Sequence, residues 1–132
     1  MRDSRLEAWE KQLKSMFDEI DGELEEKYGK MFTLHPARPK HGVTLSRELD
    51  GLFNIGASFS PGFGSTHGRG YVIDVDMVTL DRVPAEMRGI ILEYVVNRIR
   101  KKLPRWFPKR QLRVERDGHV FKIVGDLSLG GV

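Results

Sequence analysis

The 132-residue sequence contains no cysteine. A disulfide framework, a thiolate zinc site, an iron–sulfur cluster and a cysteine nucleophile are therefore all excluded. Long apolar runs are also missing, and none approaches the roughly 18–20 residues that a helix needs to cross a bilayer. Residues 1–5 are mostly charged and lead into an amphipathic segment, not an apolar one. This start predicts no secretory signal, no membrane attachment and a cytoplasmic protein.

The composition is that of a globular protein, with 39% hydrophobic and 31% charged residues. The length predicts a single domain over residues 1–132. Its net charge of +3 conceals an asymmetry between two parts of the chain. Residues 1–30 carry six Lys or Arg against nine Asp or Glu, whereas residues 31–132 carry sixteen against ten. We therefore expect an acidic N-terminal helix attached to a basic body.

Two segments have the apolar spacing of an amphipathic helix. The first runs over residues 4–28, where apolar residues recur at three- and four-residue steps and so share one helical face. The second begins at Pro84, which suits the first turn of a helix, and we expect Pro104 to end it. The apolar stripes are Leu6, Trp9, Leu13, Met16, Phe17, Ile20, Leu24 and Tyr28 in the first helix, and Met87, Ile90, Ile91, Tyr94, Val95, Ile99 and Leu103 in the second.

Four segments have the pattern of strands. Residues 52–59 and 71–79 alternate between apolar and polar positions, which is typical of half-buried strands. Residues 111–117 and 119–125 flank Asp117-Gly118, a strong signal for a two-residue hairpin turn. That turn predicts a register in which Arg113 lies opposite Lys122. Two facing cations would be unfavourable without an anion between them, which weakly indicates a binding surface.

The predicted element order is α-β-β-α-β-β. The economical arrangement of these elements is an α+β two-layer sandwich, with two helices on one face of a four-stranded, mainly antiparallel sheet. The apolar stripe of the first helix is long for a small sheet to cover. Any part left exposed would favour a homo-oligomer or another subunit.

Basic residues concentrate in residues 98–116, with nine Lys or Arg and a single acidic residue. Such a cluster is typical of a surface that binds nucleic-acid phosphates or an acidic protein. The alternative is a solvated helix end, since cations are favoured at helix C-termini. We predict a non-catalytic binding module without a cofactor, whose binding residues are Arg69, Arg100, Lys101, Arg105, Trp106, Lys109, Arg110, Arg113 and Lys122.

A second pattern joins Gly64-Ser65 to Asp74 and Asp76. Two carboxylates two residues apart on a strand point the same way and can hold Mg²⁺, while a glycine-rich turn can approach a triphosphate. The pattern resembles the Gly-Ser…Asp-x-Asp arrangement of nucleotidyltransferases of the DNA polymerase beta type. The resemblance implies a Mg²⁺-dependent nucleotidyl or phosphoryl transferase, with Gly64 and Ser65 at phosphate and Asp74 and Asp76 at the metal. The alternative is that both aspartates form the solvated face of a strand.

Overall fold

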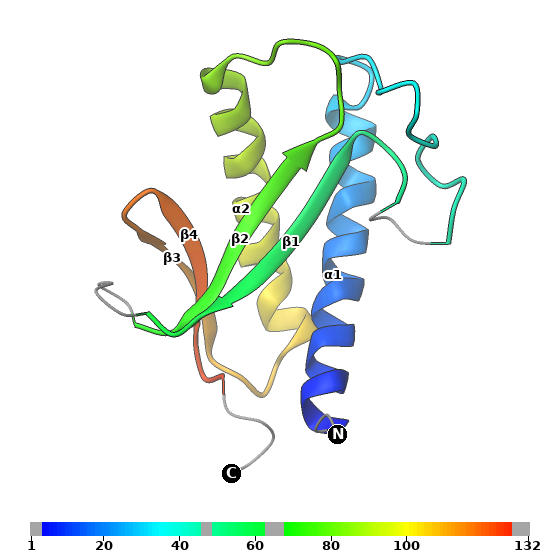
Figure 1. Ribbon diagram of the computed structural model, residues 1–132. Coiled ribbons are helices and arrows are strands. Elements are labelled where there is room, and N and C mark those ends of the chain that lie inside the picture. The colour runs from blue at the N-terminus through cyan, green and yellow to red at the C-terminus, as the bar shows by residue number, and fades with distance from the viewer. Residues whose placement is uncertain (1–3, 46–48, 63–67, 128–132) are drawn as a thin grey trace.

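The computed structural model describes residues 4–45, 49–62 and 68–127 (Figure 1). Two helices lie on one face of a four-stranded antiparallel sheet, so the predicted α+β class and element order are confirmed. No helix in the described ranges has both the length and the apolar character to cross a membrane. The elements are α1 (Ser4–Tyr28), β1 (Phe53–Ser60), β2 (Gly70–Met77), α2 (Ala85–Trp106), β3 (Leu112–Asp117) and β4 (Val120–Gly125).

The core lies between the two helices and the sheet. Each helix buries much of its predicted apolar stripe, because residues three and four apart share one helical face. Trp9 of α1 packs against Phe107, with ring centroids 4.7 Å apart, and so closes the core at the end of α2. The fully buried core residues include Met16, Ile20 and Leu24 of α1, Phe53 of β1, Ile91, Val95 and Ile99 of α2, and Ile123 of β4.

α2 continues to Trp106, so the prediction that Pro104 ends it is wrong. A proline within a helix removes one hydrogen bond, here the one that would reach the Arg100 carbonyl. The last turn closes nevertheless, because the Phe107 N–H donates to the Leu103 carbonyl at 2.8 Å. Burial of Phe107 against the core favours this extra turn.

The predicted register of the β3–β4 hairpin is also wrong. Asp117 pairs with Val120, so the turn residues are Gly118 and His119 and the partners shift by two positions. Gly118 has φ +65°, whereas no described non-glycine residue has a positive φ. A glycine with positive φ at the first turn position fits a type II′ turn. A type I′ turn at Asp117-Gly118 would instead place Asp117 in the unfavourable left-handed conformation. In this register Lys122 pairs with Glu115 and not with Arg113, so the predicted like-charged pair does not form.

The strand order is β1-β2-β4-β3, and its central junction is short. β1 and β2 pair over eight residues and β3 and β4 over six, but β2 and β4 share only the pairs Tyr71–Ile123 and Val72–Lys122. Beyond these pairs the two hairpins diverge, and the β3–β4 turn points away from β2 (Figure 1). The sheet therefore consists of two hairpins joined at one end.

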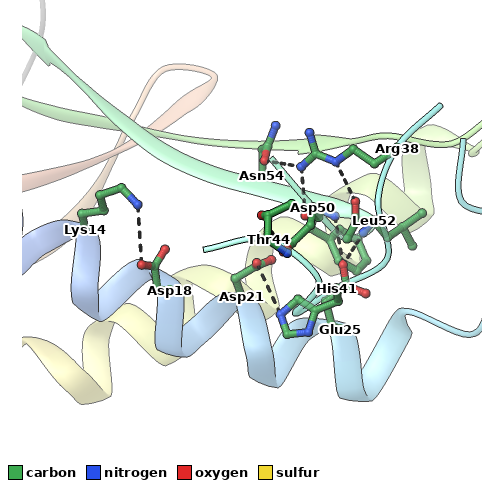
Figure 2. Close-up of polar contacts among 12 residues, drawn as sticks. Lys14, Asp18, Asp21, Glu25, Arg38, His41, Thr44, Asp50, Leu52 and Asn54 are labelled. Carbon is green, nitrogen blue, oxygen red and sulfur yellow. Dashed lines mark hydrogen bonds and ion pairs between the residues drawn. The ribbon is translucent and has the colours of Figure 1, made fainter. Parts of the chain in front are cut away.

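The connector between α1 and β1 is fastened to the C-terminal half of α1 (Figure 2). The Glu25 carboxylate accepts hydrogen bonds from the backbone N–H groups of Leu52 and Phe53, the latter at 3.2 Å. The Arg38 guanidinium donates to the Asp50 carbonyl at 3.0 Å. These charged side chains supplement backbone hydrogen bonds of the loop, such as the one from the Gly51 N–H to the Pro39 carbonyl at 2.9 Å. Together they fix where β1 begins.

Candidate nucleic-acid interface

Several cations of the predicted basic cluster hold the two helices together. Lys102 is only 4% exposed, and its Nζ lies 2.7 Å from Oε1 of Glu19 and 3.3 Å from Oε1 of Glu23. The Arg98 guanidinium contacts the same Glu23 at 2.7 Å. The hydrogen bond from Lys102 lowers the pKa of the Glu19 carboxyl. These cations join α2 to the acidic face of α1 and are not available to an external partner.

Two further predicted binding residues make contacts around β3. Arg100 donates to the Val114 carbonyl at 3.3 Å, which ties α2 to this edge strand. Arg113 donates to the Glu115 carboxylate at 3.1 Å, and both side chains are solvent-accessible. A pair of this kind contributes little to stability, so Arg113 can exchange its partner for an external anion at small cost.

Three predicted binding residues remain exposed and have no hydrogen-bond or ion-pair partner within the described residues. They are Lys101 and Arg105, which lie four positions apart on α2, and Lys109, which lies in the segment after it. Arg105 is close enough to Glu19 to contribute to the lowered pKa of that carboxyl. The positive charge of these three side chains therefore faces solvent.

Trp106 and Arg110 line a hollow of about 210 Å³ beside these cations, together with Lys109. Trp106 is half-buried, and its carbonyl accepts a hydrogen bond from the Gln12 side chain. The Arg110 guanidinium lies over the Trp9 ring, 4.9 Å from its centroid. The half-buried indole of Trp106 thus lies beside cations, and its hydrogen bond to Glu19 also contributes to the lowered pKa of that carboxyl. We call Lys101, Arg105, Trp106, Lys109 and Arg110 the basic end.

The structure places the other two predicted binding residues differently from each other. Arg69 is exposed and immediately precedes β2, whose start lies at the same end of the molecule as the segment after α2 (Figure 1). Lys122 is only 3% exposed, on the sheet face opposite the helices, and its Nζ lies 3.0 Å from the Asp117 carboxylate and 2.9 Å from the Gly68 carbonyl. Arg69 can extend the basic end, whereas Lys122 is an internal residue.

Asp74 and Asp76 lie on the same exposed face of β2, as predicted. Burial raises the pKa of the Asp74 carboxyl, and the neighbouring charge of Asp76 raises it further. Gly64 and Ser65, the predicted phosphate residues, lie outside the described residues. Over the described ranges no three His, Asp or Glu side chains are grouped so that they could hold a metal ion. The arrangement seen is therefore a carboxylate pair without a described third ligand.

A cleft that the sequence did not predict opens where β2 and β4 diverge. It measures about 260 Å³ and is lined by apolar side chains from β2, α2 and β4. Its polar groups are Asp74 of β2, Arg88 of α2 and His119 of the β3–β4 turn. Only the strand order brings these residues together, so no local sequence signal indicates the cleft.

Comparison with known proteins gives two matches. Residues 4–125 match a protein family described as "Uncharacterised protein". An "Uncharacterized protein" of Borreliella burgdorferi (strain ATCC 35210 / DSM 4680 / CIP 102532 / B31) is 34% identical over 125 residues, which cover 95% of this chain and 98% of that relative. No solved structure matches. Neither description names an activity, a ligand or a partner.

Proposed function

Since the chain belongs to this family of uncharacterised proteins, we propose from its own surface that it is a non-catalytic module that binds single-stranded nucleic acid. The binding surface in this proposal is the basic end, with Arg69 as an extension.

One observation carries the proposal: the basic residues of 98–116 fall into two groups. Cations such as Arg98 and Lys102 form ion pairs between the two helices. Lys101, Arg105 and Lys109 form no hydrogen bond or ion pair with any described residue and are exposed. Contacts to phosphates supply most of the affinity of non-specific nucleic-acid binding, and these three cations lie within a single stretch of nine residues.

Trp106 gives this cationic surface a preference for single strands. Unstacked bases bind to exposed aromatic rings, and base–aromatic stacking is sequence-tolerant because every base has a π-face. The hollow beside Trp106 is bordered by Lys109 and Arg110, so a phosphate next to a stacked base would meet a cation. A solvated helix end would need the cations but not a partly exposed indole beside them.

The test is fluorescence anisotropy with labelled single-stranded RNA and DNA over a series of salt concentrations. Four phosphate contacts to a single strand predict a log–log slope of about −3 against salt. The double variant Arg105→Ala/Lys109→Ala removes two contacts and should reduce the slope to about half. Trp106→Ala should weaken binding by about 1–3 kcal/mol and leave the slope unchanged.

The matched control removes two exposed cations elsewhere. Lys30 and Arg82 lie beyond α1 and before α2, at the end of the molecule opposite the basic end (Figure 1). Lys30→Ala/Arg82→Ala makes the same change in net charge. Because both residues lie away from the basic end, this variant should retain the wild-type salt dependence. No binding at low salt, or equal losses in the two double variants, would refute the proposed surface. Binding to a polyglutamate peptide but not to nucleic acid would reassign the surface to an acidic protein partner.

A second candidate function is Mg²⁺-dependent nucleotidyl or phosphoryl transfer at Asp74 and Asp76. The observation in its favour is that the two carboxylates are close enough for the charge of Asp76 to raise the pKa of Asp74. A bound cation would relieve this repulsion. The enzyme hypothesis predicts thermal stabilisation by Mg²⁺ with a nucleoside triphosphate, abolished in Asp74→Ala. Without any such stabilisation of the wild-type protein the hypothesis fails.

A further inference from the structure

The two edges of the sheet differ sharply in their protection. β3, at one edge, carries four charged residues among its six. β1, at the other, has the sequence Phe-Asn-Ile-Gly-Ala-Ser-Phe-Ser, with neither a charge nor a proline. It pairs with β2 over all eight residues without a bulge. Soluble proteins protect edge strands with charges, prolines, bulges or a covering element, and the first three are missing from β1.

A groove lined by apolar and charged side chains runs beside this edge. It measures about 570 Å³ and lies between β1 and the N-terminal half of α1. Phe59, near the end of β1, is 55% exposed although it packs edge-on against Tyr71. The apolar residues lining the groove are Leu13, Phe17, Ile55, Ala57, Phe59 and Tyr71. Exposed apolar surface continuous with an open strand edge is typical of an interface.

The charged residues on the α1 side of the groove identify the occupant. They are Glu7, Glu10, Lys11 and Lys14, whose spacing puts them on one stripe of the helix. We call these four residues the rim. If a second α1 lies antiparallel across a two-fold axis between positions 10 and 11, Glu7 meets Lys14 and Glu10 meets Lys11. The rim is therefore complementary to a second copy of itself, as a two-fold interface requires.

We propose that the chain forms a homodimer through the β1 edge and the rim. The two β1 strands pair antiparallel across an axis perpendicular to the sheet, and the same axis brings the two α1 helices together on one face. Lys14 already contacts Asp18 at 3.6 Å within one copy, with both side chains well exposed (Figure 2). Such an exposed pair is weak, so it does not prevent Lys14 from reaching Glu7 of the second copy.

The test reverses the charges of the rim one sign at a time. Lys11→Glu/Lys14→Glu makes the rim wholly acidic, and Glu7→Lys/Glu10→Lys makes it wholly basic. Each change makes all the rim pairs of the dimer repulsive. Sedimentation velocity should therefore give a dimer dissociation constant at least about a hundredfold higher than that of the wild type. An equimolar mixture of the two variants should restore a dimer, because the opposite rims are complementary again.

Two controls distinguish the loss of this interface from a general charge effect and from misfolding. Lys30→Glu/Arg82→Glu makes the same charge change outside the groove and should remain dimeric. Circular dichroism checks that the rim variants fold, and hydrogen exchange of the β1 amides should be slower in the wild type than in either variant. A wild type that is monomeric at all attainable concentrations would overturn the proposal and leave the groove to another partner. A dimer that survives both reversals would also overturn it, since the contact would then lie elsewhere.

Discussion

Replacing Lys122 by methionine tests the role of its ammonium group, which lies on the sheet face opposite the helices. Methionine keeps most of the length and apolar volume of lysine but removes its charge. The side chains of Lys122 and Asp117 are only 4% and 9% exposed, and Nζ also donates to the Gly68 carbonyl. Removing one partner of a buried ion pair leaves the other charge uncompensated, at a cost of about 3–5 kcal/mol. We therefore expect Lys122→Met to lower the free energy of unfolding by roughly this amount.

Equilibrium unfolding in urea measures the loss. With a slope of about 2 kcal/mol per molar urea, the midpoint should fall by roughly 1.5–2.5 M. Asp117→Leu/Lys122→Met removes both charges and should recover most of the stability, because an apolar pair can replace a buried ion pair at little cost. If Lys122→Met lowers the free energy of unfolding by less than about 1 kcal/mol, the reasoning is refuted, because ion pairs that contribute so little are typical of exposed surfaces.

Substitutions at four other residues test separate features. Asp74→Asn should raise the melting temperature at neutral pH and lose this advantage in acid. Because the pKa of Asp74 is raised in the folded protein, the wild type gains stability as the pH falls through that pKa. Thermal unfolding at several pH values checks this. A variant that is less stable than the wild type at neutral pH would contradict it. Gly118→Ala should cost about 1–2 kcal/mol for its positive φ alone, whereas Gly125→Ala should cost clearly more in urea unfolding, because the added Cβ would lie 2.1 Å from the Gln111 carbonyl oxygen. Glu25→Ala should destabilise the start of β1 by about 2–3 kcal/mol, with Glu25→Gln retaining part of that stability, and equal losses would show that its charge is unimportant.

Local sequence signals were sufficient to predict the elements of this fold. The apolar stripes predicted both helices, alternation predicted β1 and β2, and the Asp117-Gly118 turn signal predicted β3 and β4. All four strands were predicted to within about two residues. The hairpin register failed because Asp117-Gly118 and Gly118-His119 are both acceptable turn pairs. In the turn that forms, the Asp117 carboxylate contacts Lys122, and this contact is not visible in the local pattern.

The candidate site was only partly predictable. Exposure of Lys101 and Arg105 agrees with their positions off the apolar stripe of α2, and Lys109 lies in the segment after that helix. Lys102 carried a usable signal, because it lies three residues after the buried Ile99 and so continues the core face. Lys122 carried none, since it is on the sheet face away from the helices and is covered by a loop distant in sequence.

The short junction between the two hairpins has a consequence for the order of folding. Almost all strand pairing joins segments that are neighbours along the chain, and only Tyr71–Ile123 and Val72–Lys122 join distant ones. Closing a short loop is fast. Bringing distant segments together loses more chain entropy, and this loss occurs before the favourable contacts between them form. Each hairpin can thus form early and by itself. We therefore expect the slow step of folding to be the docking of the β3–β4 hairpin beside β2, after α2 has reversed the direction of the chain.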